Sequence, residues 1–243
     1  MQAQGKSEPT AFRFRGFAAE TQTFLASLEP EPCPVDWPAG ERIAYATHVL
    51  SPLKALAGDL AQMLAHVTPP LGLEPRIGRS LSWPDDMPPI SEECPVRQLR
   101  AWDAASTPAD SPTLFVTLWS QHIEVGITGG GAEPRASARL RHHLLDSPAG
   151  NLRSMAAKLL AHGWEIGGTA LDFPAGVVPG DVQAWMRERI RVTRTLSWGD
   201  WVDEPAFAAE IAAEFSSLLP LFDAMRGVGV LAKDTARTSS EPS

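Results

Sequence analysis

The chain of 243 residues is short of several residue types, and each shortage narrows what the protein can be. It has only two cysteines, Cys33 and Cys94, which lie beside prolines without CxxC spacing or a neighbouring histidine. This usage favours reduced thiols over a disulfide framework. No strongly apolar run approaches the length that crosses a bilayer, and the opening MQAQGKSEPT lacks the form of a secretory signal. We therefore expect a cytoplasmic protein without a membrane segment.

Positive charge is also scarce, because 21 lysines and arginines stand against 29 aspartates and glutamates, for a net charge of −8. No overall field would draw such a chain to a phosphate backbone, so we expect no nucleic-acid partner. The adjacent His142 and His143 point about 100° apart on a helix and do not chelate one metal ion as an i,i+4 pair would. The glycines at 129–131 lack both phosphate-loop patterns. The sequence predicts neither a metal nor a cofactor.

Apolar residues make up 44% of the chain, which is enough for a sizeable core. Residues 1–11 show no apolar period, and the polar end of the chain is too poor in apolar surface to order itself. No composition break demands two domains. We expect one domain over residues 12–228, between disordered tails at 1–11 and 229–243.

Apolar residues recur at helical spacing in several stretches. Helices are predicted at 17–29, at about 45–67, at about 135–146, at 148–162, at about 181–190 and from Asp203 or Glu204 through Met225. Pro52 lies inside the second of these, so either Ser51 caps a new helix or the helix bends there. Pro220 is expected to kink the last one.

Alternating apolar and polar residues predict strands elsewhere. Residues 112–119 and 122–128, joined by Ser120-Gln121, are typical of a β-hairpin with Ile123, Val125 and Ile127 on one face. Residues 164–173 and 190–198 are also expected to be extended. Helices and strands without regular βαβ units indicate an α+β fold, with an antiparallel or mixed sheet around a central hairpin, covered by helices.

The segments RSLSWPDD, from Arg79, and RTLSWGDW, from Arg194, are near-twins with unlike flanks, which argues against a duplicated unit. If each is a strand, its leucine and tryptophan (Trp83 and Trp198) face the core, while its arginine lies at the rim and pairs with an acid or an aromatic ring. Alternatively, Arg79 and Arg194 converge on one anionic or planar ligand.

The order of several landmarks over residues 14–226 resembles the bacterial family called domain of unknown function 2461. They are Phe17–Thr21 with Phe24-Leu25, then Trp37, Tyr45 and Pro52, the hairpin from His122 to Gly131, and Phe173–Gly176. The family's segment richest in ionisable groups corresponds to residues 76–90. Arg76, Arg79 and Asp86 match its pattern there, whereas Ser80, Ser82, Met87 and Ile90 stand where the family has an acid, Arg, Lys and Tyr. The resemblance implies that any chemistry run there by the family is run differently in this chain.

Three kinds of function remain open. The eight tryptophans against one tyrosine indicate a groove or partner surface, so a binding protein would hold a small organic anion or a protein partner with the ligand-binding residues Arg76, Arg79, Trp83, Asp86, Arg194 and Trp198. A metal-independent enzyme on a small polar substrate would use Glu124 as the base and His122 as its partner on the polar side of one strand. A structural subunit of an assembly is the third. Catalytic activity and oligomeric state are left undecided.

Overall fold

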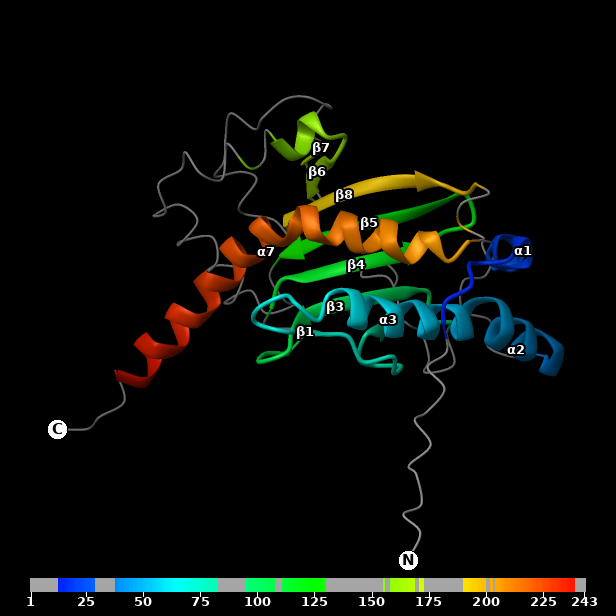
Figure 1. Cartoon of the computed structure of the whole chain (residues 1–243), viewed down its shortest axis with the longest axis horizontal. Helices are drawn as coiled ribbons and strands as arrows, with labels where there is room; N and C mark the ends of the chain where they lie inside the picture. Colours follow the sequence, from blue (N-terminus) through cyan, green and yellow to red (C-terminus); the bar gives the residue numbers. More distant parts are fainter. Residues whose placement is uncertain are drawn as a thin grey trace, which may run out of the picture.

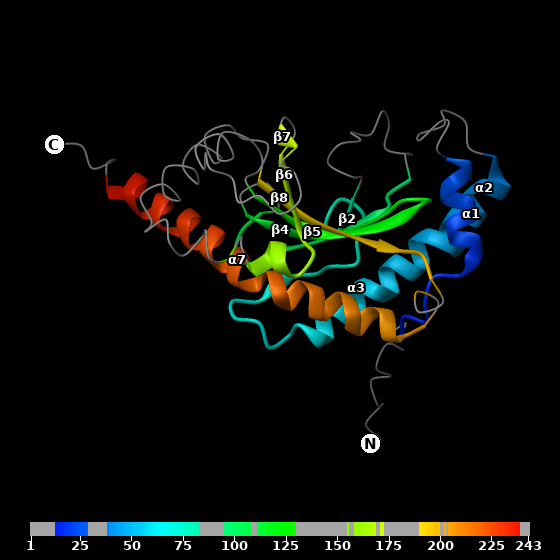
Figure 2. The same cartoon turned by 90° about the horizontal axis from the view of Figure 1, so that it is seen from above.

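The protein folds into one twisted antiparallel sheet with helices packed along one of its faces. The computed structural model describes residues 13–28, 38–82, 95–107, 111–129, 155, 158–168, 171–172, 190–199, 202 and 204–238. Figure 2 shows α3 and α7 running along one side of the sheet, and Figure 1 shows the same two helices in front of the strands. The expected α+β class, with an antiparallel sheet and a hairpin at its centre, is confirmed.

The sheet has the strand order β1-β3-β4-β5-β8-β6-β7, and the short strand β2 pairs with β3 beside β1. The strand bounds are β1 Leu71–Gly72, β2 Leu81–Ser82, β3 Gln98–Asp103, β4 Thr113–Leu118, β5 His122–Gly129, β6 Glu165–Gly168, β7 Leu171–Asp172 and β8 Ile190–Ser197. The strand predictions at 112–119, 122–128 and 190–198 are thereby confirmed, and the one at 164–173 is confirmed for residues 165–168 and 171–172. β8 is the last strand in the sequence, but it lies in the inner part of the sheet, where it pairs with β5.

The structure fixes the register of the β4–β5 hairpin, which the sequence left open. Leu118 lies opposite Ile123, and the Trp119 N–H donates to the His122 carbonyl, so Ser120 and Gln121 form a two-residue turn. The apolar side chains of both strands face α3 and α7, as the alternation predicted. From α1 (Ala19–Ser27), the Gln22 amide donates to the Ser120 carbonyl and ties this helix to the turn.

The core lies between the sheet and the helices. It combines strand residues with one stripe each from α3 (Ser51–Met63) and α7 (Ala206–Thr238). Its most fully buried members include Leu53, Leu56 and Leu60 of α3, Phe207, Ile211, Phe215 and Leu218 of α7, and Leu99, Val116, Val125 and Val192 of the sheet. Burial of these apolar stripes holds both helices against one face of the sheet, and the residues of the opposite sheet face do not take part in this core.

Pro52 does not break the second predicted helix. α2 (Ala39–Tyr45) passes through the π-helical turn η1 (Ala46–Leu50) straight into α3, with Pro52 in its first turn. Proline lacks the N–H that would bond the carbonyl four residues earlier. That carbonyl belongs to His48, and the buried Thr21 hydroxyl of α1 donates to it at 2.7 Å. The side chain of another helix therefore supplies the missing hydrogen bond.

The single tyrosine connects this helical layer to the sheet. The Tyr45 hydroxyl donates to the Val96 carbonyl at 3.1 Å and accepts from the Val96 N–H at 3.0 Å. Val96 lies two residues before the first residue of β3, so the contact fixes the segment that leads into that strand. Burial raises the pKa of Tyr45 well above its ordinary value and outweighs the opposing effect of the Val96 hydrogen bond.

The last helix is longer than the sequence predicts. α7 continues to Thr238, past residue 228 where the folded domain was expected to end. Its direction changes near the middle of its length (Figure 1), and Pro220 lies in this middle part. The final part of the helix extends beyond the sheet.

Several predictions fall outside the described residues. They are the tail at 1–11, the helices at 135–146 and 181–190, most of residues 148–157, Cys33, Cys94, Trp83 and Asp86. Helical residues at 158–161, followed by Gly163 with a positive φ of 80°, agree with the predicted end of the 148–162 helix. None of the described helices has the length and apolar character that crossing a membrane requires.

Candidate functional site

The sheet face opposite α3 and α7 carries mostly polar side chains, and we call it the polar face. Strand alternation and register place together on it Ser82, Gln98, Arg100, Trp102, Thr113, Phe115, Thr117, His122, Glu124, Gly126, Thr128, Arg191, Thr193, Thr195 and Ser197. The residues between them along each strand face the core. The polar face is the candidate location for a site, because its polar groups do not contribute to the apolar core on the other face of the sheet.

The charged centre of the polar face is an ion pair between Arg191 of β8 and Glu124 of β5. The Arg191 Nε donates to Glu124 Oε1 at 3.3 Å and Nη2 donates to Oε2 at 2.5 Å. Two parallel hydrogen bonds fix the guanidinium plane as well as its position. The two side chains are 26% and 14% exposed, so the pair is partly desolvated and still reachable from solvent.

An aromatic ring supports the guanidinium from below. The Arg191 Cζ lies 5.1 Å from the centroid of the Phe115 ring, within the range of a cation–π contact. The ring occupies space left by Gly126, because a Cβ at that position would come within 2.9 Å of Phe115 and would also clash with the Val192 carbonyl oxygen. Gly126, Phe115 and Arg191 therefore form a stack that aims the arginine along β5 toward Glu124.

Next to this stack, a buried chain of neutral groups crosses β2, β3 and β4. The Ser82 hydroxyl donates to Gln98 Oε1, and Gln98 Nε2 donates to the Thr117 hydroxyl, both at 3.1 Å. All three side chains are buried. Exposure then increases across the sheet, since Glu124, Arg191 and Thr193 are half-buried and Thr195 is exposed. The accessible part of the polar face thus lies over β5 and β8.

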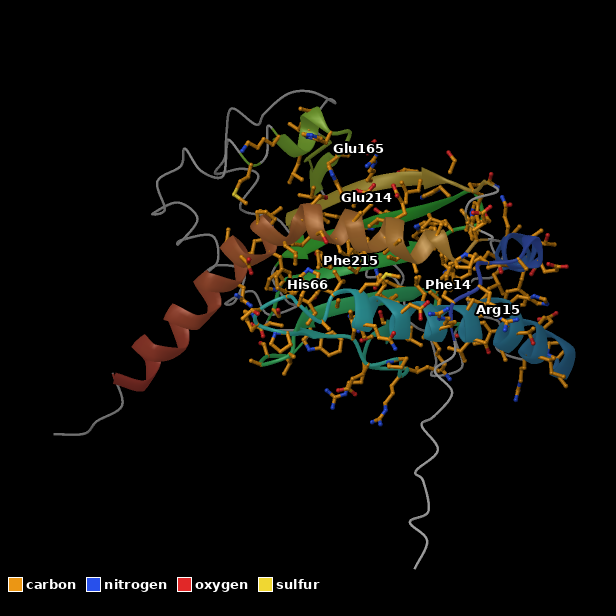
Figure 3. The ribbon with its side chains drawn as sticks, viewed as in Figure 1. Phe14, Arg15, His66, Glu165, Glu214 and Phe215 are labelled. Atoms are coloured by element: carbon orange, nitrogen blue, oxygen red, sulfur yellow. The ribbon has the colours of Figure 1, made fainter. Side chains whose placement is uncertain are left out.

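Arg194, predicted to bind a ligand, points to the other face. Its Nη1 donates to Glu214 Oε1 of α7 at 2.6 Å, and Figure 3 shows Glu214 where this helix crosses the strands. Burial raises the pKa of Glu214, the Arg194 charge opposes that effect, and the neighbouring Glu210 adds to it. Arg194 follows the alternative in which a rim arginine pairs with an acid, while Leu196 and Trp198 pack against the core.

The two twin-motif arginines are not brought together. Arg79 is exposed in the turn before β2, whereas Arg194 is on β8, and β3, β4 and β5 lie between their strands. Four strand spacings of about 4.8 Å put the strands roughly 19 Å apart. A shared cavity framed by Arg79 and Arg194 is therefore not formed. Arg76 is likewise exposed in the turn before β2, far along the sheet from β8.

His122 and Glu124 share the polar face, as predicted, but they have different neighbours. The His122 ring lies 6.1 Å from that of Trp119, whose indole also has Arg97 above it at 5.1 Å. Glu124 instead pairs with Arg191. Trp198 is half-buried and its indole N–H donates to the Trp119 carbonyl at 2.8 Å, so its polar atom is already used.

Arg191 is the functional candidate that the sequence did not reveal. The alternation in IRVTRTLS does place it with Thr193 and Thr195 on one strand face, opposite Val192 and Arg194. What could not be read was the pairing of β8 with β5, which sets Arg191 against Glu124 across 67 residues of chain. Attention to every arginine on an expected strand, beyond those in the repeated motif, would have included it.

No group of three or more histidine, cysteine, aspartate or glutamate side chains suited to a metal ion occurs among the described residues. No family model matches the chain, and no curated protein or solved structure matches it. The resemblance to the domain of unknown function 2461 stays a prediction.

Proposed function

We propose that the protein binds a small organic anion on the polar face, with Arg191 as the anion-binding group. The observation that carries this is the fixed, half-buried guanidinium on an inner strand of the sheet. Glu124 takes two of its five N–H donors, which leaves three for a ligand. Planar, preoriented donors suit a carboxylate or a phosphate.

Glu124 compensates the charge of Arg191, so the pair attracts anions less strongly than a lone arginine would. Selection then rests on the hydrogen-bond geometry of the guanidinium, which the buried Phe115 ring holds in position. This proposal keeps the binding function expected from the sequence and moves it from Arg79 and Arg194 to Arg191.

Catalysis by Glu124 and His122 has no comparable support. Both Glu124 oxygens accept hydrogen bonds from Arg191, so the carboxylate would have to leave this partner to take a substrate proton. His122 lies against Trp119 instead of Glu124. We therefore propose binding alone.

The test compares two variants that differ only at residue 191, Glu124→Gln and the double variant Glu124→Gln with Arg191→Gln. Neither leaves an unpaired carboxylate on the polar face. Short carboxylates, dicarboxylates and phosphate monoesters are titrated by calorimetry. We expect Glu124→Gln to keep at least wild-type affinity and the double variant to lose about tenfold or more, because charge-assisted hydrogen bonds are removed.

The matched control is Arg76→Gln, which removes an exposed arginine that the sequence had favoured. It should bind like the wild type. The proposal would be contradicted if the two Glu124 variants bound equally well, or if the wild type bound none of the compounds in the panel.

A further inference from the structure

The polar face also holds a buried hydroxyl that has no hydrogen-bond partner among the described residues. It belongs to Thr128, a residue that is 9% exposed. A buried hydroxyl without a partner costs free energy, and a buried valine of the same shape would avoid that cost. By contrast, Thr117 on the neighbouring strand has its hydroxyl bonded to Gln98. The two threonines of this face thus differ, because the Thr117 hydroxyl has a partner and the Thr128 hydroxyl has none among the described residues.

Thr128 lies beside the proposed anion site. It is opposite Arg191 of β8 and opposite Thr113 of β4 in the register, and all three are on the polar face. Arg191 runs along the strands from there, over Phe115, to reach Glu124. Because Phe115 is paired with Gly126, the guanidinium lies about two residues along β5 from Thr128, or roughly 7 Å.

We propose that Thr128 is a specificity-determining residue of the Arg191 site, an inference that rests on the proposed function. Its hydroxyl forms a hydrogen bond with a second polar group of the ligand, whose anionic group is bound by Arg191. The spacing selects an organic anion with a hydroxyl or carbonyl several bonds away from the charged group, such as a hydroxy acid of four to six carbons. A simple fatty acid of the same length fills the site without satisfying Thr128.

The first experiment measures thermal stability without any added small molecule. Thr128→Val should leave the unfolding temperature unchanged or raise it, because no hydrogen bond is lost and an unsatisfied group disappears. The matched control Thr117→Val makes the same change on the same face and should lower the unfolding temperature, because it leaves the Gln98 amide without its acceptor. A clear drop for Thr128→Val would overturn the inference.

The second experiment compares butanoate with 4-hydroxybutanoate, and pentanoate with 5-hydroxypentanoate, by calorimetry. We expect the wild type to bind at least one hydroxy acid about three- to tenfold more tightly than its matched alkanoate, as one hydrogen bond provides. Thr128→Val should remove that preference and leave alkanoate binding unchanged.

The outcomes separate the two proposals. Equal binding of hydroxy acid and alkanoate by the wild type, or a preference that survives in Thr128→Val, overturns the role of Thr128 while Arg191-dependent binding still stands. If none of these four acids binds, the role of Thr128 also falls, and the dicarboxylates and phosphate monoesters decide the proposed function separately.

Discussion

At the scale of single residues, the candidate site depends on one missing side chain. Gly126 sits in the central strand β5 and lets the Phe115 ring lie against the backbone of the sheet. The ring in turn supports the Arg191 guanidinium. Glycine weakens a strand in general, so its presence here indicates a close approach that no larger residue allows.

We expect Gly126→Ala to destabilise the protein by about 1–3 kcal/mol, because the new methyl overpacks against Phe115 and the Val192 carbonyl. Gly58→Ala is the matched control. Gly58 lies inside α3 with nothing within 4 Å of its would-be methyl, so alanine there should stabilise by about 0.5–1 kcal/mol. Urea unfolding of both variants checks the opposite signs. A neutral Gly126→Ala would show that the stack is not close-packed.

At the scale of elements, α1 and the α2–η1–α3 helix depend on each other. Pro52 leaves the His48 carbonyl without its intrahelical partner, and the Thr21 hydroxyl supplies the bond. Periodicity predicted both helices. It did not predict the contact between them, which arises because Pro52 lacks a backbone donor and the Thr21 hydroxyl of α1 replaces it. The π-helical turn at 46–50 ends two residues before Pro52.

Thr21→Val should therefore cost about 1–3 kcal/mol, because it leaves a carbonyl without a partner at a buried contact. The control is Thr23→Val, where the exposed hydroxyl bonds only the Ala19 carbonyl of the same helix. Its effect should stay within about 0.5 kcal/mol. Chemical denaturation measures both, and similar losses in the two variants would argue against a special role for Thr21.

At the scale of the whole molecule, the Arg194–Glu214 pair links the sheet to the helical layer. The Glu214 side chain is 7% exposed and that of Arg194 is 39% exposed. Burial raises the pKa of Glu214 despite the nearby Arg194, and Glu210 adds to the shift. The folded protein therefore binds a proton at Glu214 more tightly than the unfolded chain does. This contribution to stability is complete below the ordinary value of 4.5 and is lost as pH rises through the folded-state pKa.

Glu214→Gln removes that titration while its amide oxygen can still accept from Arg194. The free energy of unfolding of the variant should fall less between pH 4.5 and neutral pH than that of the wild type. Urea titrations across this range give the difference between the two curves, which isolates residue 214. Parallel curves for wild type and Glu214→Gln would contradict the assigned cause.

The elements were predicted more fully than the site. Alternation in 122–128 and the stripe from Phe207 to Met225 depend on neighbours in sequence, and both are confirmed. The end of α7 was missed because the polar composition after residue 228 outweighed local helix propensity in the prediction. The shared role predicted for Arg79 and Arg194 rested on the similarity of two short segments. Such similarity does not tell how far apart the segments lie in the fold.

The sequence by itself determined which stretches are helical or extended and which side of each strand is apolar, because these depend on periods of a few residues. Only the tertiary structure decided that β8 pairs with β5, that Arg194 turns to α7 and that Arg191 meets Glu124. Strand order and register are set by the joint burial of all apolar faces, a property of the whole chain. The candidate site depends on this strand order and register, so no short sequence motif predicts it.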